Sequence, residues 1–106
     1  MYKITDAVYN CYTEIGRFRN IEKEVLTRRL SANVDSSTTR ERIFENENKW
    51  IYKLGSCEIK VDHDTNMIYH IKWVENPLPI SSSMGRIIED SYRKYGLNKK
   101  GNQIIA

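Results

Sequence analysis

The chain has few of the residues from which metal and redox centres are built. Its 106 residues include two histidines and two cysteines. Prolines are equally few, with two in the chain. Cys11 and Cys57 lack the C-x-x-C spacing of zinc or redox sites and fall on predicted apolar faces, which is typical of reduced thiols in a cytoplasmic protein. A disulfide between them stays open as an alternative. We therefore expect a cytoplasmic protein with no metal ion and no other cofactor.

One segment begins like a calcium-binding loop but does not continue as one. In Asp62-His63-Asp64-Thr65-Asn66, the next residue is Met67 where such a loop needs glycine, and Trp73 stands where it needs a bidentate acid. The two histidines, His63 and His70, have no cysteine or carboxylate at ligand spacing. We interpret the segment as the polar tip of a hairpin.

Long hydrophobic runs are also missing. The chain starts Met1-Tyr2-Lys3-Ile4-Thr5-Asp6 without an uninterrupted apolar segment, so we expect neither a secretory signal nor a membrane span. A length of 106 residues with 40% hydrophobic content suits one domain with a modest core. We assign residues 1–97 to a single α+β domain. Residues 98–106, with Lys99 and Lys100, form a basic tail that either frays or adds an edge strand.

Two turn signals in the middle of the chain predict an antiparallel β-meander. Leu54-Gly55-Ser56-Cys57 is typical of a two-residue hairpin led by glycine. The loop Asp64-Thr65-Asn66, whose asparagine suits a left-handed conformation, predicts a second hairpin. A third turn at Asn46-Glu47 pairs Ile43 with Trp50 and adds a first strand. The sequence therefore predicts four antiparallel strands in a defined register.

Alternation along these strands divides the sheet into an apolar face and a charged face. The apolar face contains Ile43, Trp50, Tyr52, Leu54, Cys57, Ile59, Val61, Tyr69, Ile71 and Trp73. The opposite face, which we call the predicted basic face, contains Arg40, Arg42, Phe44, Lys49, Ile51, Lys53, Glu58, Lys60, Asp62, Ile68, His70, Lys72 and Val74. Basic residues outnumber acidic ones there by three to one, and Glu58 is expected to pair with Lys72.

Helical periodicity lies on both sides of the sheet. Apolar residues recur at spacings of three and four from Ile4 to Phe18, with Thr5 or Asp6 as a cap. The stripe then drifts, which predicts either a second helix after a break near residues 16–20 or one long projecting helix. Residues 31–38 are rich in Ser, Asn and Asp, and we expect a loop there.

A C-terminal helix completes the predicted fold. Residues 81–83 supply its cap, and Gly96 with Leu97 predicts a Schellman ending. The fold class is therefore α+β: one or two N-terminal helices, a four-stranded antiparallel meander and a C-terminal helix, with the helices on the apolar face. This order is similar to that of double-stranded-RNA-binding domains and of small ribonuclease toxins of the RelE and barnase type. The likeness is architectural, because Ser81-Ser82-Ser83-Met84 replaces the lysine pair of the former and no toxin motif matches.

The predicted basic face is the leading candidate for function. The net charge is only +3, so local clustering must carry any binding of nucleic acid. The predicted contact residues are Arg42, Lys49, Lys53, Lys60, Lys72 and Phe44, extended by Arg93 and Lys94 from the C-terminal helix. A solvated face that uses lysine against edge aggregation is the simpler alternative.

Two further function classes stay open. One is a protein-interaction module, such as an inhibitor or regulator made by a phage or another mobile element. The other is a metal-independent ribonuclease in which His70 transfers a proton and Lys60, directly opposite, stabilises developing phosphate charge. Only Glu58 is near enough in the register to act as a complementary base. Since Lys72 is expected to hold that carboxylate, we expect no catalysis.

Overall fold

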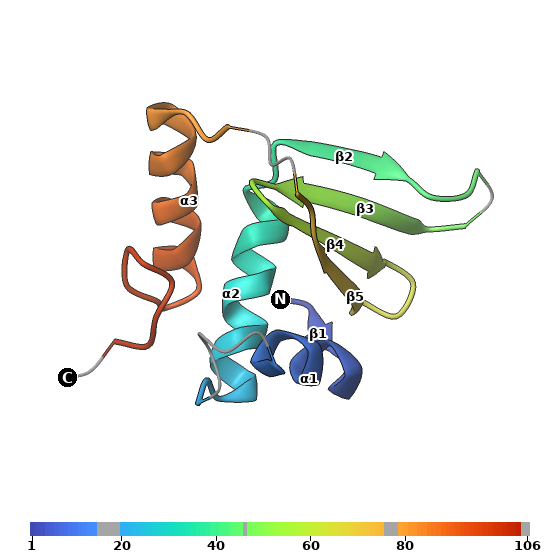
Figure 1. The fold of residues 1–106 in the computed structure, drawn as a ribbon, viewed down its shortest axis with the longest axis horizontal. Helices are drawn as coiled ribbons and strands as arrows, with labels where there is room; N and C mark the ends of the chain where they lie inside the picture. The colour runs from blue at the N-terminus through green and yellow to red at the C-terminus, as the bar shows by residue number, and fades with distance from the viewer. Residues whose placement is uncertain (15–19, 46, 76–78, 105–106) are drawn as a thin grey trace.

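Three helices and a five-stranded mixed sheet make up the computed structural model, which describes residues 1–14, 20–45, 47–75 and 79–104 (Figure 1). In chain order the elements are β1 (Lys3–Ile4), α1 (Asp6–Glu14), α2 (Lys23–Asp35), β2 (Thr39–Arg42), β3 (Lys49–Leu54), β4 (Cys57–Asp62), β5 (Met67–Trp73) and α3 (Ser82–Lys94). The strand order is β1-β5-β4-β3-β2. The α+β class is confirmed.

The prediction of a wholly antiparallel sheet of four strands is wrong because β1 adds a parallel edge strand. Lys3 pairs with Met67 and Ile4 with Ile68. The backbone N–H of Lys3 donates to the Asn66 carbonyl at 2.9 Å, and that of Thr5 donates to the Ile68 carbonyl at 3.2 Å. Two residues are too few to produce an alternating pattern, so this strand has no sequence signal of its own.

The hairpin between β3 and β4 has the predicted register. Leu54 pairs with Cys57 and Tyr52 with Ile59, and Gly55 has a φ of 58°, in the left-handed region that favours glycine. The alternation between these two strands, and therefore the placing of their side chains on two faces, is confirmed.

The β4–β5 pairing follows the prediction for four of its six residue pairs and then shifts. Cys57 pairs with Trp73 and Lys60 with His70, as predicted, but Val61 pairs with Ile68 across a β-bulge. The extra residue is Tyr69. One inserted residue reverses the faces before it, so the prediction for these two side chains is wrong. Ile68 is fully buried in the core and Tyr69 is half-buried.

The predicted register of the first strand is wrong by one residue. Arg42 pairs with Trp50 and Arg40 with Tyr52, whereas the sequence predicted that Ile43 would face Trp50. Because β2 ends at Arg42 and β3 begins at Lys49, the connection is longer than a two-residue turn; residue 46 lies outside the described part. Both arginines consequently lie on the face that holds the core, not on the predicted basic face.

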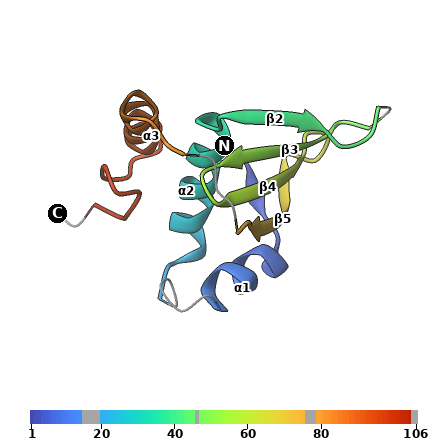
Figure 2. The same cartoon turned by 45° about the horizontal axis from the view of Figure 1, so that its top comes forward.

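Two helices cover one face of the sheet, and the third packs behind them. Helix α1, capped by Thr5 Oγ1, which accepts a hydrogen bond from the Val8 N–H at 3.2 Å, packs on β5, and α2 packs on β3. Two N-terminal helices are therefore present, with residues 15–19 between them outside the described chain. Helix α3 contacts α2 and lies on its far side from the sheet (Figure 2), so the prediction that it covers the sheet is wrong.

The core follows from this layering. Between the sheet and the first two helices lie Ile4, Val8, Tyr12, Leu26, Leu30, Val34, Tyr52, Ile59, Val61, Ile68 and Ile71. A smaller cluster between α2 and α3 contains Val25, Ala32, Tyr92 and Leu97.

Helix α2 extends into the segment that the sequence predicted as a loop. It continues to Asp35, with Ser31 and Val34 buried. The Ser31 hydroxyl accepts a hydrogen bond from the Tyr2 backbone N–H at 3.2 Å. A serine satisfied in this way costs little in a helix, so composition misled the prediction.

Helix α3 begins and ends as the sequence predicted. Ser81 Oγ accepts a hydrogen bond from the Met84 N–H at 3.3 Å. At the other end the Leu97 N–H donates to the Tyr92 carbonyl and the Gly96 N–H to the Arg93 carbonyl, with Gly96 at a φ of 76°, which is a Schellman motif. The chain beyond it forms a hydrogen-bonded loop, bridged between Leu97 and Gln103.

Candidate nucleic-acid interface and adjoining pocket

The predicted lysines do share the sheet face that points away from the core. Lys49 and Lys53 on β3, Lys60 on β4 and Lys72 on β5 occupy it by their register, and we call it the outer lysine face. Acidic residues are interleaved with them. Glu58 stands between Lys53 and Lys72, and Asp62 stands opposite Lys49; Lys49 Nζ is also 3.4 Å from Glu47 Oε2. Much of the positive charge on this face is therefore matched by carboxylates.

The remaining predicted contact residues lie elsewhere. Arg42 is on the opposite face of the sheet. Arg93 and Lys94 are at the end of α3, which packs on α2 and not on the outer lysine face, and Lys94 Nζ is 3.8 Å from Asp35 Oδ2. Phe44, in the connection after β2, is 59% exposed. The structure therefore does not join these residues into one surface with the outer lysine face.

The two residues considered for a ribonuclease, Lys60 and His70, are adjacent as predicted. Lys60 and His70 are directly opposite each other, and His70 is exposed. Glu58 flanks Lys60 on the same strand face and pairs across the strands with Lys72. A histidine and a lysine on an open sheet face can bind a phosphate, but an acid–base mechanism needs two titratable groups on either side of it.

Two arginines surround a tryptophan at the end of the sheet that the helices leave uncovered. The Arg42 Cζ lies 5.1 Å from the centroid of the Trp50 ring and the Arg40 Cζ lies 6.0 Å from it. Cations at these distances are attracted by the aromatic face. Strands β2 and β3 reach beyond the helices here (Figure 1), so both guanidinium groups are exposed. We call Arg40, Arg42 and Trp50 the arginine surface.

Hydrogen bonds fix the orientation of this surface. Trp50 Nε1 donates to Asn48 Oδ1 at 3.3 Å, and Arg42 Nη1 donates to the Glu45 carbonyl at 3.2 Å. These contacts keep the indole edge turned toward the loop while its faces stay next to the arginines.

An aromatic cluster lies around Tyr52, which follows Trp50 on the same face of β3. Tyr52, which is 8% exposed, has its hydroxyl 2.6 Å from His63 Nε2. The His63 ring meets Tyr52 and Tyr2 edge to face, with centroids 5.9 and 5.8 Å apart. Burial raises the pKa of Tyr52 while nearby Arg40 lowers it, and burial raises the pKa of Tyr2. Both phenols are therefore neutral hydrogen-bonding groups at physiological pH.

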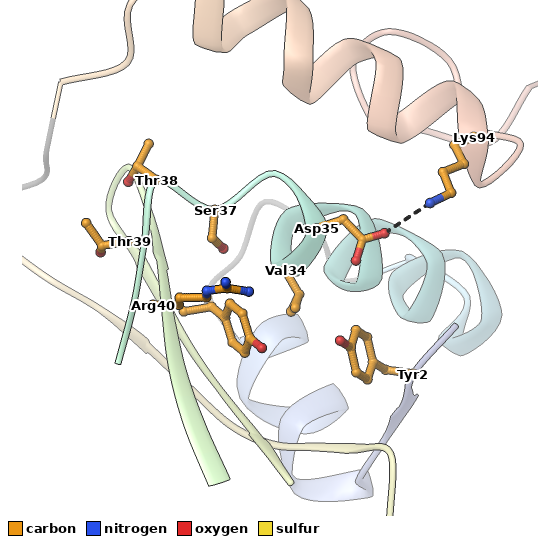
Figure 3. A pocket seen from close by; sticks show the side chains of 9 residues that line it. Tyr2, Val34, Asp35, Ser37, Thr38, Thr39, Arg40 and Lys94 are labelled. Atoms are coloured by element: carbon orange, nitrogen blue, oxygen red, sulfur yellow. Dashed lines mark ion pairs between the residues drawn. The ribbon is translucent and has the colours of Figure 1, made fainter. Parts of the chain in front are cut away.

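A pocket of about 520 Å³ adjoins the arginine surface (Figure 3). It lies where the N-terminal segment, the end of α2, the start of β2 and the end of α3 meet. Its lining residues are Tyr2, Val34, Asp35, Ser37, Thr38, Thr39, Arg40, Tyr52 and Lys94. Arg40 belongs both to this pocket and to the arginine surface.

The acidic side of the pocket is already paired. The Tyr95 hydroxyl donates a hydrogen bond to Asp35 Oδ2, and Lys94 Nζ approaches the same oxygen. Burial, followed by this hydrogen bond to the carboxylate, raises the pKa of Tyr95. The Asp35 charge is thus balanced from α3.

Three of the residues that shape this region were missed from the sequence as site residues. Arg40 was assigned to the wrong face. A correct length for the β2–β3 connection would have placed it on the face of Tyr52. Asp35 was placed in a loop, although Val34, just before it, continues the four-residue apolar spacing of Leu26 and Leu30. For Tyr2 no sequence signal exists, because its place depends on the short parallel strand β1.

Two other kinds of site are not found in the part of the chain that the structure describes. No three side chains among His, Cys, Asp and Glu lie close enough to hold a metal ion. None of the described helices combines the length and the apolar character that crossing a bilayer requires.

Comparison with models of protein families, with curated proteins and with solved structures gives no match to this chain.

Proposed function

We propose that this protein binds nucleic acid and that the arginine surface is its principal contact. The observation that carries the proposal is the position of two exposed arginines against Trp50 at 5.1 and 6.0 Å, on a chain of net charge +3. Guanidinium groups pair with phosphates and stack on bases, and aromatic rings stack on unpaired bases. This combination suits a single strand better than a duplex.

The outer lysine face contributes less to this binding. Glu58 and Asp62 stand opposite its lysines, and a cation that faces a carboxylate has less to gain from a phosphate. Arg40 and Arg42, by contrast, face Tyr52 and Trp50 across the strands. We therefore rank the arginine surface above the residues that sequence alone selected.

The test is a salt titration with short single-stranded RNA and DNA that carry a fluorescent label. Wild type is expected to bind more weakly as salt rises, with a straight line of log K against log salt and a slope of roughly −0.7 per phosphate contact. The double variant Arg40→Gln/Arg42→Gln is expected to lose about tenfold in affinity and to flatten the slope by about 1.4, which is about 0.7 for each arginine removed.

The matched control is Lys53→Gln/Lys60→Gln, which removes the same charge from the outer lysine face. Its expected loss is smaller, about threefold or less. Absence of binding by wild type at low salt, or binding that is independent of salt, would overturn the proposal. The RNA is examined on a gel after each titration; cleavage that disappears in His70→Ala would instead favour the ribonuclease.

A protein-interaction module is the second candidate, and the exposed edge strand favours it. β2 is the last strand in the sheet order, all four of its residues are exposed, and Phe44 follows it. An edge of this kind can pair with an extended segment of another protein. If this is the function, a bound partner protects the β2 backbone amides from hydrogen exchange while Arg40→Gln/Arg42→Gln leaves the affinity almost unchanged.

A further inference from the structure

Arg40 connects the arginine surface to the pocket. Its guanidinium group and the Tyr2 hydroxyl point into the same space beside Val34 (Figure 3). Among the described residues, neither the Arg40 guanidinium nor the Tyr2 hydroxyl makes a hydrogen bond, and Arg40 has no ion pair within 4.0 Å. Two donors that share a pocket and have no hydrogen-bond acceptor from the described part of the protein are suited to an acceptor from a ligand.

We propose that this pocket binds the phosphomonoester of a nucleotide, with the Arg40 guanidinium and the Tyr2 hydroxyl as donors to its oxygens. This goes beyond nucleic-acid binding on the arginine surface, because a small molecule can occupy the pocket without a strand. The phosphate can belong to a free nucleotide or to the phosphorylated end of a strand, and the chemistry at Arg40 is the same for both.

The charges of the lining favour an anion. Arg40 and Lys94 are opposed only by Asp35, which leaves one net positive charge, and Asp35 Oδ2 already contacts Tyr95 and Lys94. A phosphomonoester carries roughly −1.5 to −2 at neutral pH, more than the single charge of a phosphodiester. A terminal phosphate is therefore attracted more strongly than one inside a strand.

The end of α2, which also borders the pocket, does not oppose this. A helix C-terminus repels anions through its free carbonyl groups. Here the Ser36 hydroxyl donates to the Ala32 carbonyl at 2.8 Å and the Ser37 hydroxyl to the Asn33 carbonyl at 2.7 Å. These side chains satisfy two carbonyls of the last turn, and the Ser37 N–H donates to a third, that of Val34, at 3.3 Å. The repulsion of a bound anion by this helix end is reduced accordingly.

The size and the remaining walls fit a nucleoside attached to that phosphate. About 520 Å³ is within the range of roughly 300–1,000 Å³ typical of small-molecule sites. Val34 and Tyr52, both buried, provide an apolar wall. Asp35 Oδ1, which accepts no hydrogen bond from the described residues, can accept one from a sugar hydroxyl.

The experiment is calorimetric titration of the full chain with adenosine 5′-monophosphate, with adenosine and with inorganic phosphate. Wild type is expected to bind the monophosphate saturably and at least tenfold more tightly than adenosine. Arg40→Gln is expected to lose about tenfold or more in affinity, and Tyr2→Phe about threefold to tenfold. Arg42→Gln is the matched control because it lies on the same face of β2 but does not line the pocket; a change of less than about twofold is expected.

Three results would overturn the inference: no saturable binding of the monophosphate, equal binding of adenosine, or an equal loss in Arg42→Gln and Arg40→Gln. Thermal unfolding of each variant verifies the fold, which the exposed position of Arg40 should preserve. If Tyr2→Phe unfolds, the two arginine variants still decide the question.

Oligonucleotides with phosphate or hydroxyl ends distinguish the two sources of the phosphate. If a strand end is the ligand, a 5′- or 3′-phosphate strengthens binding by about fivefold or more, and the monophosphate competes for that gain. If a free nucleotide is the ligand, end phosphorylation changes nothing while the monophosphate still binds. The strand with hydroxyl ends reports on the arginine surface alone, so failure of the proposed function is seen separately.

Discussion

The arginine surface and the outer lysine face lie on opposite faces of the same sheet and differ in which side chain stands opposite each cation. Arg40 and Arg42 face aromatic rings across the β2–β3 pairing. Lys53 and Lys72 both face Glu58 across their pairings. A count of charges along a strand treats all of these cations as equally available to a ligand. The cross-strand neighbour decides which of them is available to a ligand.

The two faces also differ in how far binding and stability can be separated. The arginine surface continues directly into the core through Tyr52 and Val61, whereas the outer lysine face has no helix against it among the described residues. Both arginine side chains are nevertheless exposed. Variants at Arg40 and Arg42 should therefore change binding while leaving the fold intact.

The largest expected effect tests whether the two faces are assigned correctly on β4. Ile59 is fully buried, and Lys60 follows it on the opposite face. Ile59→Ala is expected to lower the free energy of unfolding by about 2–5 kcal/mol, because it removes buried methyl groups and leaves a cavity. Lys60→Ala is expected to change it by about 0.5 kcal/mol or less. Urea denaturation measures both, and a reversed order would contradict the assignment.

A second pair of variants tests the bulge that reverses the faces on β5. Ile68→Ala is expected to cost about 2–4 kcal/mol, since this side chain is fully buried. Tyr69→Ala is expected to cost less, about 1–2 kcal/mol, since Tyr69 is only half-buried. If chemical denaturation shows that Tyr69 matters more than Ile68, β4 and β5 pair without the bulge.

Replacing arginine by lysine on the arginine surface, and lysine by arginine on the outer lysine face, compares how the two faces contribute to binding. Arg40→Lys/Arg42→Lys keeps the charge but removes the planar group that stacks against Trp50 and a base, so affinity for single-stranded RNA should fall about threefold to tenfold. Lys53→Arg/Lys60→Arg should leave it within about twofold. Fluorescence anisotropy measures both. An equal response would mean that charge alone governs binding.

The smallest expected effect is a change in the free energy of unfolding at high pH, caused by the ionisation of Tyr12 in the core. Burial raises the pKa of Tyr12 from 10.0 to about 12. The unfolded chain ionises first, so the stability that the neutral phenol contributes is complete below pH 10 and is lost as pH rises toward 12. Between pH 8 and pH 11 we expect Tyr12→Phe to lose less stability than wild type, by on the order of 1 kcal/mol. If denaturation shows that wild type and Tyr12→Phe lose the same stability between pH 8 and pH 11, the pKa of Tyr12 is not raised by burial.

The candidate site was predictable only in part. The pairing of Lys60 with His70 and of Glu58 with Lys72 followed from the turns and is confirmed. The grouping of Arg42 with the lysines was wrong because one additional residue in a connection reverses a whole strand. The pocket was not predictable, since it needs the N-terminal segment, α2, β2 and α3 in one place.

The sequence by itself determined the hairpin between β3 and β4, the cap of each end of α3 and the apolar face of the central strands. Each of these depends on residues close together in the chain, such as Gly55, Ser81 and Gly96, whose conformational preferences act locally. The tertiary structure alone decided the parallel pairing of β1, the bulge at Tyr69, the face of Arg40 and the extension of α2. These depend on contacts between distant segments, where the burial of Ile68 and the hydrogen bond to Ser31 outweigh local preference.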